Sequence, residues 1–111
     1  MGISTHILDT TQGRPASGVE VILERMTDGG AALALGRGTT DADGRVKALL
    51  AESPAPGTYR ITFRVGAWFE SRGVDSFYPE VAIAFTVARA GEHFHVPLLL
   101  NPFGFTTYRG S

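Results

Sequence analysis

The chain has 111 residues, 43% of them apolar and 19% charged, and its formal net charge at pH 7 is −1. This apolar content supports a hydrophobic core and excludes a disordered chain, and the length predicts one domain spanning residues 1–111. The sequence contains no cysteine, which excludes disulfides, thiol catalysis and cysteine-ligated metal, and the balanced charge argues against nucleic acid as a partner.

Short strands with alternating apolar and polar residues dominate the predicted elements. The clearest covers residues 57–65, where Tyr59, Ile61 and Phe63 share one face and threonine and arginine occupy the other. In chain order, we predict strands at residues 3–9, 19–24, 32–36, 57–65, 81–87, 93–100 and 103–108, and one short helix at residues 67–72. Turn signals such as Asp28-Gly29-Gly30 separate the strands, and many short strands at this spacing predict an all-β, antiparallel β-sandwich.

Two strand faces are unusually poor in charge. The outward face of strand 81–87 carries only small uncharged residues, namely Ala82, Ala84 and Thr86. Strand 93–100 is apolar on both faces, so Leu99 is expected to be exposed outside the core. Such faces are usually covered by another subunit, and the charged fraction lies below the ~25% usual for soluble domains. We therefore predict association with further copies of the chain.

Histidine is the side chain best suited to proton transfer near neutral pH in a chain without cysteine. The sequence has three histidines, His6, His93 and His95, and the last two share one face of a strand. Together the three would be enough for a zinc site, but a His-x-His pair alone is a weak signal. An ordinary surface or packed imidazole is an equally good interpretation of each.

Residues 41–52 resemble a calcium-binding loop only in part. Asp41 and Glu52 stand at its first and twelfth positions, but Val46 replaces the required glycine and Arg45 stands at a ligand position. We interpret the segment as an Asp-Gly turn that projects Arg45, with a surface salt bridge as the alternative. A Gly-x-Ser-x-Gly nucleophile motif is also missing.

The two ends of the sequence differ in character. The first residues have neither the basic nor the apolar part of a secretory signal, and nowhere do about 18–20 apolar residues run together. We therefore expect a cytoplasmic protein with no membrane partner. The last four residues, Tyr108-Arg109-Gly110-Ser111, follow a predicted strand directly and indicate a docked end, whereas termini usually fray.

Three segments carry a family resemblance: Ser4-Thr5-His6-Ile7-Leu8-Asp9, the turn Asp43-Gly44-Arg45, and the closing run HFHVPLLLNPFGFTTYRGS. Together they resemble 5-hydroxyisourate hydrolase, the enzyme branch of the transthyretin-like family, over the whole chain. The closing Tyr-Arg-Gly-Ser is typical of the enzyme branch. The departures are Phe94, where tyrosine is common, and Asn101, where serine is common.

The resemblance implies a sandwich of two four-stranded sheets with a short helix after the fifth strand. It also implies a homotetramer, a dimer of dimers, with active sites where the dimers meet. The catalytic positions that it implies are His6, Arg45, His95 and Ser111, and those for substrate contact are His6, Arg45, Tyr108 and Arg109. His93 is expected to have a supporting role at most.

The activity implied is hydrolytic opening of the six-membered ring of 5-hydroxyisourate to 2-oxo-4-hydroxy-4-carboxy-5-ureidoimidazoline, without metal or cofactor. Either His6 or His95 would act as the base. A non-catalytic small-molecule carrier is the alternative, although the hormone-carrying transthyretins lack both histidines, this arginine and the Tyr-Arg-Gly-Ser ending. A structural β-sandwich module is the third interpretation, because its turn chemistry occurs at residues 40–44 and 56–59.

Overall fold

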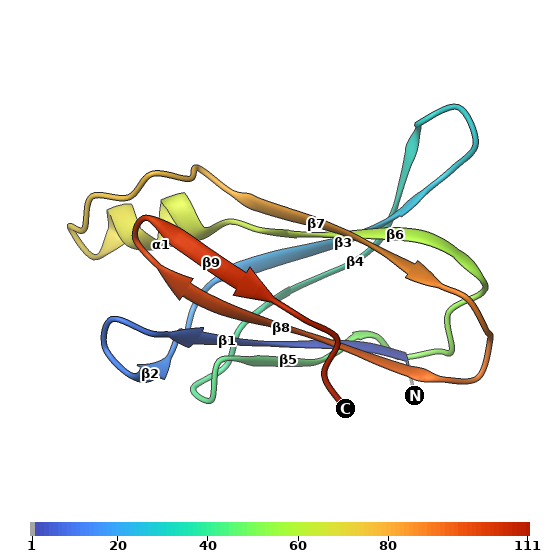
Figure 1. The fold of residues 1–111 in the computed structure, drawn as a ribbon, viewed down its shortest axis with the longest axis horizontal. Coiled ribbons are helices and arrows are strands. Elements are labelled where there is room, and N and C mark those ends of the chain that lie inside the picture. Colours follow the sequence, from blue (N-terminus) through green and yellow to red (C-terminus); the bar gives the residue numbers. More distant parts are fainter. Residues whose placement is uncertain (1) are drawn as a thin grey trace.

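The computed structural model describes residues 2–111, which form two β-sheets packed face to face and one short helix (Figure 1). The elements in chain order are β1 (Gly2–Asp9), β2 (Arg14–Pro15), β3 (Glu20–Met26), β4 (Ala32–Thr39), β5 (Arg45–Leu50), β6 (Gly57–Phe63), α1 (Val65–Ser71), β7 (Val81–Val87), β8 (His93–Asn101) and β9 (Gly104–Thr107). The predicted all-β sandwich with one short helix is confirmed.

One sheet has the strand order β4-β3-β6-β7, and the other has the order β2-β1-β8-β9 with β5 also paired to β1. The short β2 and the longer β5 share the same edge of β1: β5 pairs with its first half and β2 with its last two residues. Strands β1 and β8 run parallel, whereas the other pairs are antiparallel. This parallel pair places a strand from near the beginning of the chain beside one from near its end.

The sequence pattern missed β5 because the alternation breaks within it. A register shift lies between the β1 residues Ile3 and Thr5 where they pair with β5. As a result Val46 and Leu49, which are three residues apart, both pack against the core, and a period of two does not describe the strand. The helix starts at Val65, two residues earlier than predicted, because Val65, Trp68 and Phe69 are buried together on one helical face.

The core lies between the two sheets. Tyr59, Ile61 and Phe63 of β6 are buried as predicted, and the Tyr59 hydroxyl donates a hydrogen bond of 2.6 Å to the Ala55 carbonyl. The indole of Trp68 donates to the Ser17 carbonyl at 2.7 Å. Within residues 2–111, every buried side-chain nitrogen or oxygen has a hydrogen-bond partner, so the core carries no desolvation penalty from unpaired polar atoms.

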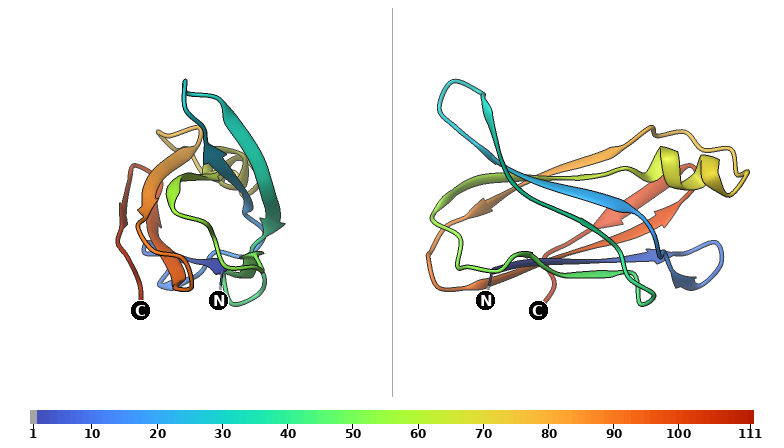
Figure 2. Two further views of the ribbon diagram at one scale, coloured as in Figure 1. Left: turned by 90° about the vertical axis from the view of Figure 1, so that its right-hand side faces the viewer. Right: turned by 180° about the vertical axis from the view of Figure 1, so that it is seen from behind.

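The outward face of β7 is open, as the sequence predicts: Ala82, Ala84 and Thr86 are all exposed. Strand β7 ends one sheet and β9 ends the other. Figure 2 shows that the two ends of the chain lie on the same side of the molecule, beside the sheet that contains β1 and β8. Within residues 2–111, no helix is long and apolar enough to cross a membrane.

Candidate active site

The parallel pairing of β1 and β8 gathers the predicted site residues on one face. It places Ser4 opposite His95 and His6 opposite Pro97, while β5 places Arg45 opposite His6. Because Ile3 and its alternate neighbours on β1 enter the core, Ser4 and His6 face outward. Residues from the beginning, middle and end of the sequence therefore meet on the outward face of this sheet.

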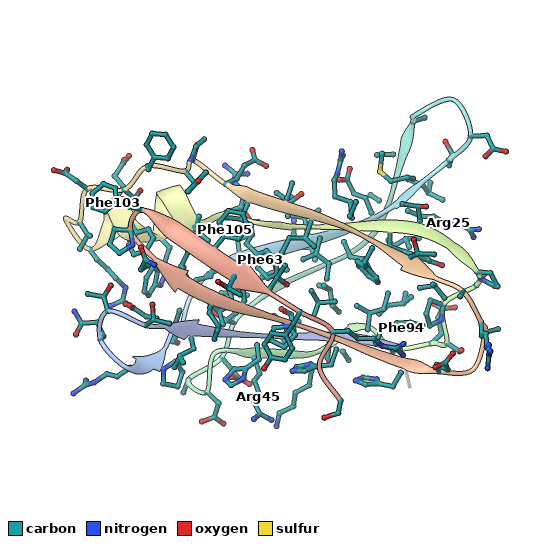
Figure 3. All side chains as sticks on the ribbon, viewed as in Figure 1. Arg25, Arg45, Phe63, Phe94, Phe103 and Phe105 are labelled. Atoms are coloured by element: carbon teal, nitrogen blue, oxygen red, sulfur yellow. The ribbon has the colours of Figure 1, made fainter. Side chains whose placement is uncertain are left out.

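A pocket of about 350 Å³ lies on this face, and we call it the histidine pocket. Its lining residues are Ser4, Thr5, Arg45, Lys47, His93, His95 and Ser111. Figure 3 shows Arg45 on the outer side of the sheet, whereas Phe63 and Phe94 lie between the two sheets. His6 does not line the pocket, but its half-buried side chain is next to Arg45 in the strand register.

The hydroxyl of Ser4 lies between two imidazoles. Its Oγ is 3.0 Å from His93 Nε2 and 2.8 Å from His95 Nδ1, and Ser4 is only 7% exposed. The sequence analysis used Ser4 only as part of the family resemblance. Its position two residues before His6, on the same strand face, was the available signal for a place in the site.

The environment of His95 favours its neutral form. Burial is the main cause that lowers the pKa of His95, and the positive charges of His6, His93 and Arg45 lower this pKa further. A histidine with a lowered pKa is unprotonated near neutral pH and is free to accept a proton there. Among the predicted histidines, His95 therefore has the electrostatic properties of a base.

A tight turn fixes the position of Arg45. Asp41 Oδ1 accepts hydrogen bonds from the backbone N–H groups of Asp43 at 2.9 Å and Arg45 at 3.0 Å. These hydrogen bonds lower the pKa of the Asp41 carboxyl, and the bond from the Arg45 N–H has the larger effect. Gly44 follows with a φ of +76°, and a Cβ there would lie 2.5 Å from the Ile7 carbonyl oxygen. The interpretation as an Asp-Gly turn that projects Arg45 is confirmed.

The last residues of the chain fold back onto His95. The Gly110 N–H donates to the His95 carbonyl at 2.8 Å. A Cβ at Gly110 would lie 2.6 Å from His95 Cδ2 and 3.2 Å from Pro97 Cγ. Glycine is therefore the residue that fits against this imidazole ring, and its close approach brings Ser111 into the histidine pocket.

Tyr108 and Arg109 lie in a different pocket of about 270 Å³ between β7 and β9, which also reaches Phe94 and the other side of His95. The Arg109 guanidinium carbon is 4.5 Å from the centre of the Phe94 ring, and Arg109 Nη2 is 3.3 Å from Glu92 Oε1. Within one chain these two residues do not line the histidine pocket, so their predicted contact with substrate stays a prediction.

The three histidines do not form a metal centre in the described part of the chain. No group of three His, Asp or Glu side chains in residues 2–111 is placed to hold a metal ion. His93 and His95 each direct one ring nitrogen at Ser4, and the cations Arg45 and Lys47 line the same pocket. Two fixed positive charges make this a poor environment for a metal cation.

Comparisons with known proteins agree on the family. The HIUase/Transthyretin family model matches residues 3–110. Over 110 residues the chain is 51% identical to a 5-hydroxyisourate hydrolase from Salmonella dublin, a match that covers 98% of this chain and 80% of that protein.

Two solved structures show that the fold alone does not separate enzyme from carrier. The Klebsiella pneumoniae 5-hydroxyisourate hydrolase has a TM-score of 0.88 and 40% identity, with 100% of both chains covered. Sea bream transthyretin in complex with thyroxine has a TM-score of 0.91 but only 28% identity, with 99% of this chain and 95% of that chain covered. The backbone is common to both, so the side chains of the site carry the distinction.

Proposed function

The chain belongs to the HIUase/Transthyretin family, and we propose from this membership and from the site that it is a 5-hydroxyisourate hydrolase. The observation that carries the proposal is the meeting of His95 and Arg45 in one pocket. A flat, hydrolysable ring with several carbonyl groups requires a proton acceptor and a fixed cation at its reacting carbonyl. The histidine pocket holds both groups.

The proposed reaction is addition of water to a ring carbonyl, followed by cleavage of the adjacent C–N bond. His95 accepts a proton from the water as the oxygen attacks, and the guanidinium of Arg45 stabilises the negative charge that develops on the carbonyl oxygen. The protonated imidazole then gives its proton to the departing ring nitrogen. His6 is the second candidate for the base, and Ser111 is positioned to orient water at the pocket. No step requires a metal or an organic cofactor.

Turnover separates this proposal from a carrier. We expect the chain, at a tenth of the substrate concentration, to consume all of the freshly made 5-hydroxyisourate faster than its spontaneous decay, as followed by ultraviolet absorbance. The assay is run with and without a chelator, and we expect equal rates. A carrier would bind and retain at most a stoichiometric amount, so decay at or below the spontaneous rate would favour the carrier.

We propose a homotetramer, as the family resemblance implies. Three features support it: the exposed Ala82-Ala84-Thr86 face, the outermost positions of β7 and β9 in their sheets, and the apolar pocket between these two edges. Sedimentation equilibrium tests the assembly, and a mass of one chain would contradict it. The cytoplasmic location and the single domain of residues 1–111 stay predictions from the sequence, and cell fractionation checks the first of them.

The fit of Gly110 against His95 gives a specific prediction. In a Gly110→Ala variant the new Cβ meets the His95 ring at 2.6 Å, so either the imidazole or the end of the chain must move. We expect kcat/KM to fall about 10- to 100-fold, because small displacements of a reacting group have effects of this size. Steady-state hydrolysis of 5-hydroxyisourate measures it.

Gly104→Ala on β9 is the matched control. A Cβ at Gly104 would lie 3.5 Å from the nearest atom of Asn101, an ordinary contact, so this variant is expected to keep the activity of the unsubstituted chain. Equal activity of the two variants would show that the end of the chain does not position His95.

A further inference from the structure

The hydrogen bonds of Ser4 link the proton positions of two histidines. Ser4 Oγ contacts His93 Nε2 at 3.0 Å and His95 Nδ1 at 2.8 Å. A serine hydroxyl has a single proton and two acceptor lone pairs, so it can donate to only one of these nitrogens, and a nitrogen that receives no proton from Ser4 must carry its own to form the hydrogen bond. The direction of this chain of two hydrogen bonds decides which nitrogen of His95 carries the proton.

The two directions have opposite consequences for His95. When Ser4 donates to His93 Nε2, its oxygen accepts from the N–H at His95 Nδ1. His95 Nε2, on the far side of the ring, then has a free lone pair. When Ser4 donates to His95 Nδ1 instead, Nε2 must carry the proton of the neutral ring and has no lone pair to accept another. Only the first direction leaves His95 able to act as a base.

We propose that Ser4 is a positioning residue that holds neutral His95 in its Nδ1–H form, with His93 accepting the hydroxyl proton. This rests on the proposed function, which it deepens by assigning the base to His95 Nε2. Ser4 itself need not touch the substrate. His93 thereby gains a role that the strand pattern did not give it: it determines the direction of both hydrogen bonds.

Positive charge surrounds the two histidines that are hydrogen-bonded to Ser4. The charged groups that face this pair are His6 from β1 and Arg45 and Lys47 from β5. Just before β8, Glu92 pairs with Arg109, and Ser111 completes the histidine pocket. Burial and these positive charges lower the pKa of His95 and so favour its neutral form.

Substitution of Ser4 tests the positioning. We expect Ser4→Ala to lower kcat about 10- to 100-fold with KM nearly unchanged, since a wrong histidine tautomer lowers kcat about 10⁴-fold where the orienting partner is a carboxylate. Ser4→Thr keeps the hydroxyl and is expected to restore most of the rate. Thr58→Ala removes an exposed hydroxyl from β6 of the other sheet and is expected to have no effect.

Two substitutions of His93 form a matched pair. Glutamine places an amide oxygen near the position of His93 Nε2 and accepts from Ser4 without titrating, whereas phenylalanine offers no acceptor. We expect His93→Gln to keep most of the activity. His93→Phe is expected to resemble Ser4→Ala. Equal activity of the two His93 variants would overturn the proposal.

A direct readout is independent of catalysis. The ¹⁵N chemical shifts of the His95 ring nitrogens report which of them is protonated. We expect protonated Nδ1 in the unsubstituted chain and a shift of the proton toward Nε2 in Ser4→Ala. Protonated Nε2 in the unsubstituted chain would overturn the proposal. If the chain shows no hydrolysis at all, the proposed function fails, and these spectra still decide whether Ser4 sets the form of His95.

Discussion

A His95→Asn variant is expected to lose about 10²- to 10⁴-fold of kcat, the contribution that a general base typically makes. Asparagine is the sharpest choice because its amide occupies the position of the imidazole Nδ1. It therefore preserves a partner for Ser4, which lies 2.8 Å from that nitrogen, while it removes Nε2. The loss then reports the missing base and not a disrupted pocket. Single-turnover hydrolysis of 5-hydroxyisourate measures it.

His6→Asn decides between the two candidate bases. If His95 is the base, this variant keeps a larger share of kcat than His95→Asn does, because His6 does not line the histidine pocket. A His95→Asn variant with the rate of the unsubstituted chain, combined with an inactive His6→Asn variant, would transfer the role of base to His6.

The lowered pKa of His95 also predicts the pH dependence. Burial lowers this pKa first, and the charges of His6, His93 and Arg45 add to the effect. The neutral, proton-accepting form therefore persists to a lower pH than for an ordinary histidine, and kcat/KM should fall only as the pH decreases through that lowered pKa. A profile of kcat/KM against pH is expected to place the acidic midpoint below about 6.5, the ordinary histidine value. A midpoint at or above that value would contradict the environment described.

The second large effect is expected from Arg45. Arg45→Gln removes the fixed cation opposite the developing oxyanion and is expected to lower kcat about 10²- to 10³-fold, as loss of one oxyanion donor does. Arg45→Lys keeps the charge but not the two-pronged geometry of the guanidinium, and it should recover only part of the rate. Hydrolysis rates of the three proteins, measured at saturating substrate, give the comparison.

Arg37→Gln is the control for a general loss of positive charge. Arg37 is exposed on β4 in the other sheet, where its Nε lies 3.4 Å from Glu20 Oε2. Its replacement is expected to leave the hydrolysis rate unchanged. If Arg37→Gln and Arg45→Gln lowered the rate equally, the effect would come from the net charge of the protein and not from the pocket.

Regular alternation was enough to predict most of the sandwich. The strands around Tyr59 and Ile83 alternate strictly, and the structure places them as expected. Strand β5 was missed because its bulge brings Val46 and Leu49 to the same side. The parallel pairing of β1 with β8 was also out of reach, because neither strand's own pattern specifies a partner 89 or more residues away in the chain.

The residues of the candidate site were likewise predicted only in part. His6, Arg45 and His95 were predicted from the family resemblance, since no spacing in the sequence brings residues so far apart together. Their place on one sheet face follows from the pairing of β1 with β5 and β8. Ser4 remained hidden because a serine gains a role only when two histidines are placed beside it. The separate location of Arg109 depends on its contacts with Phe94 and Glu92, which follow from the fold and not from the motif.

The dependence of 5-hydroxyisourate decay on protein concentration tests the account most directly. The first-order decay constant is measured over a range of concentrations for the unsubstituted chain and for His95→Asn. The account predicts a constant that rises in proportion to the concentration of the unsubstituted chain and that stays near the spontaneous value for His95→Asn. The same increase of the decay constant with protein concentration for both proteins, or no increase for either, would contradict the account.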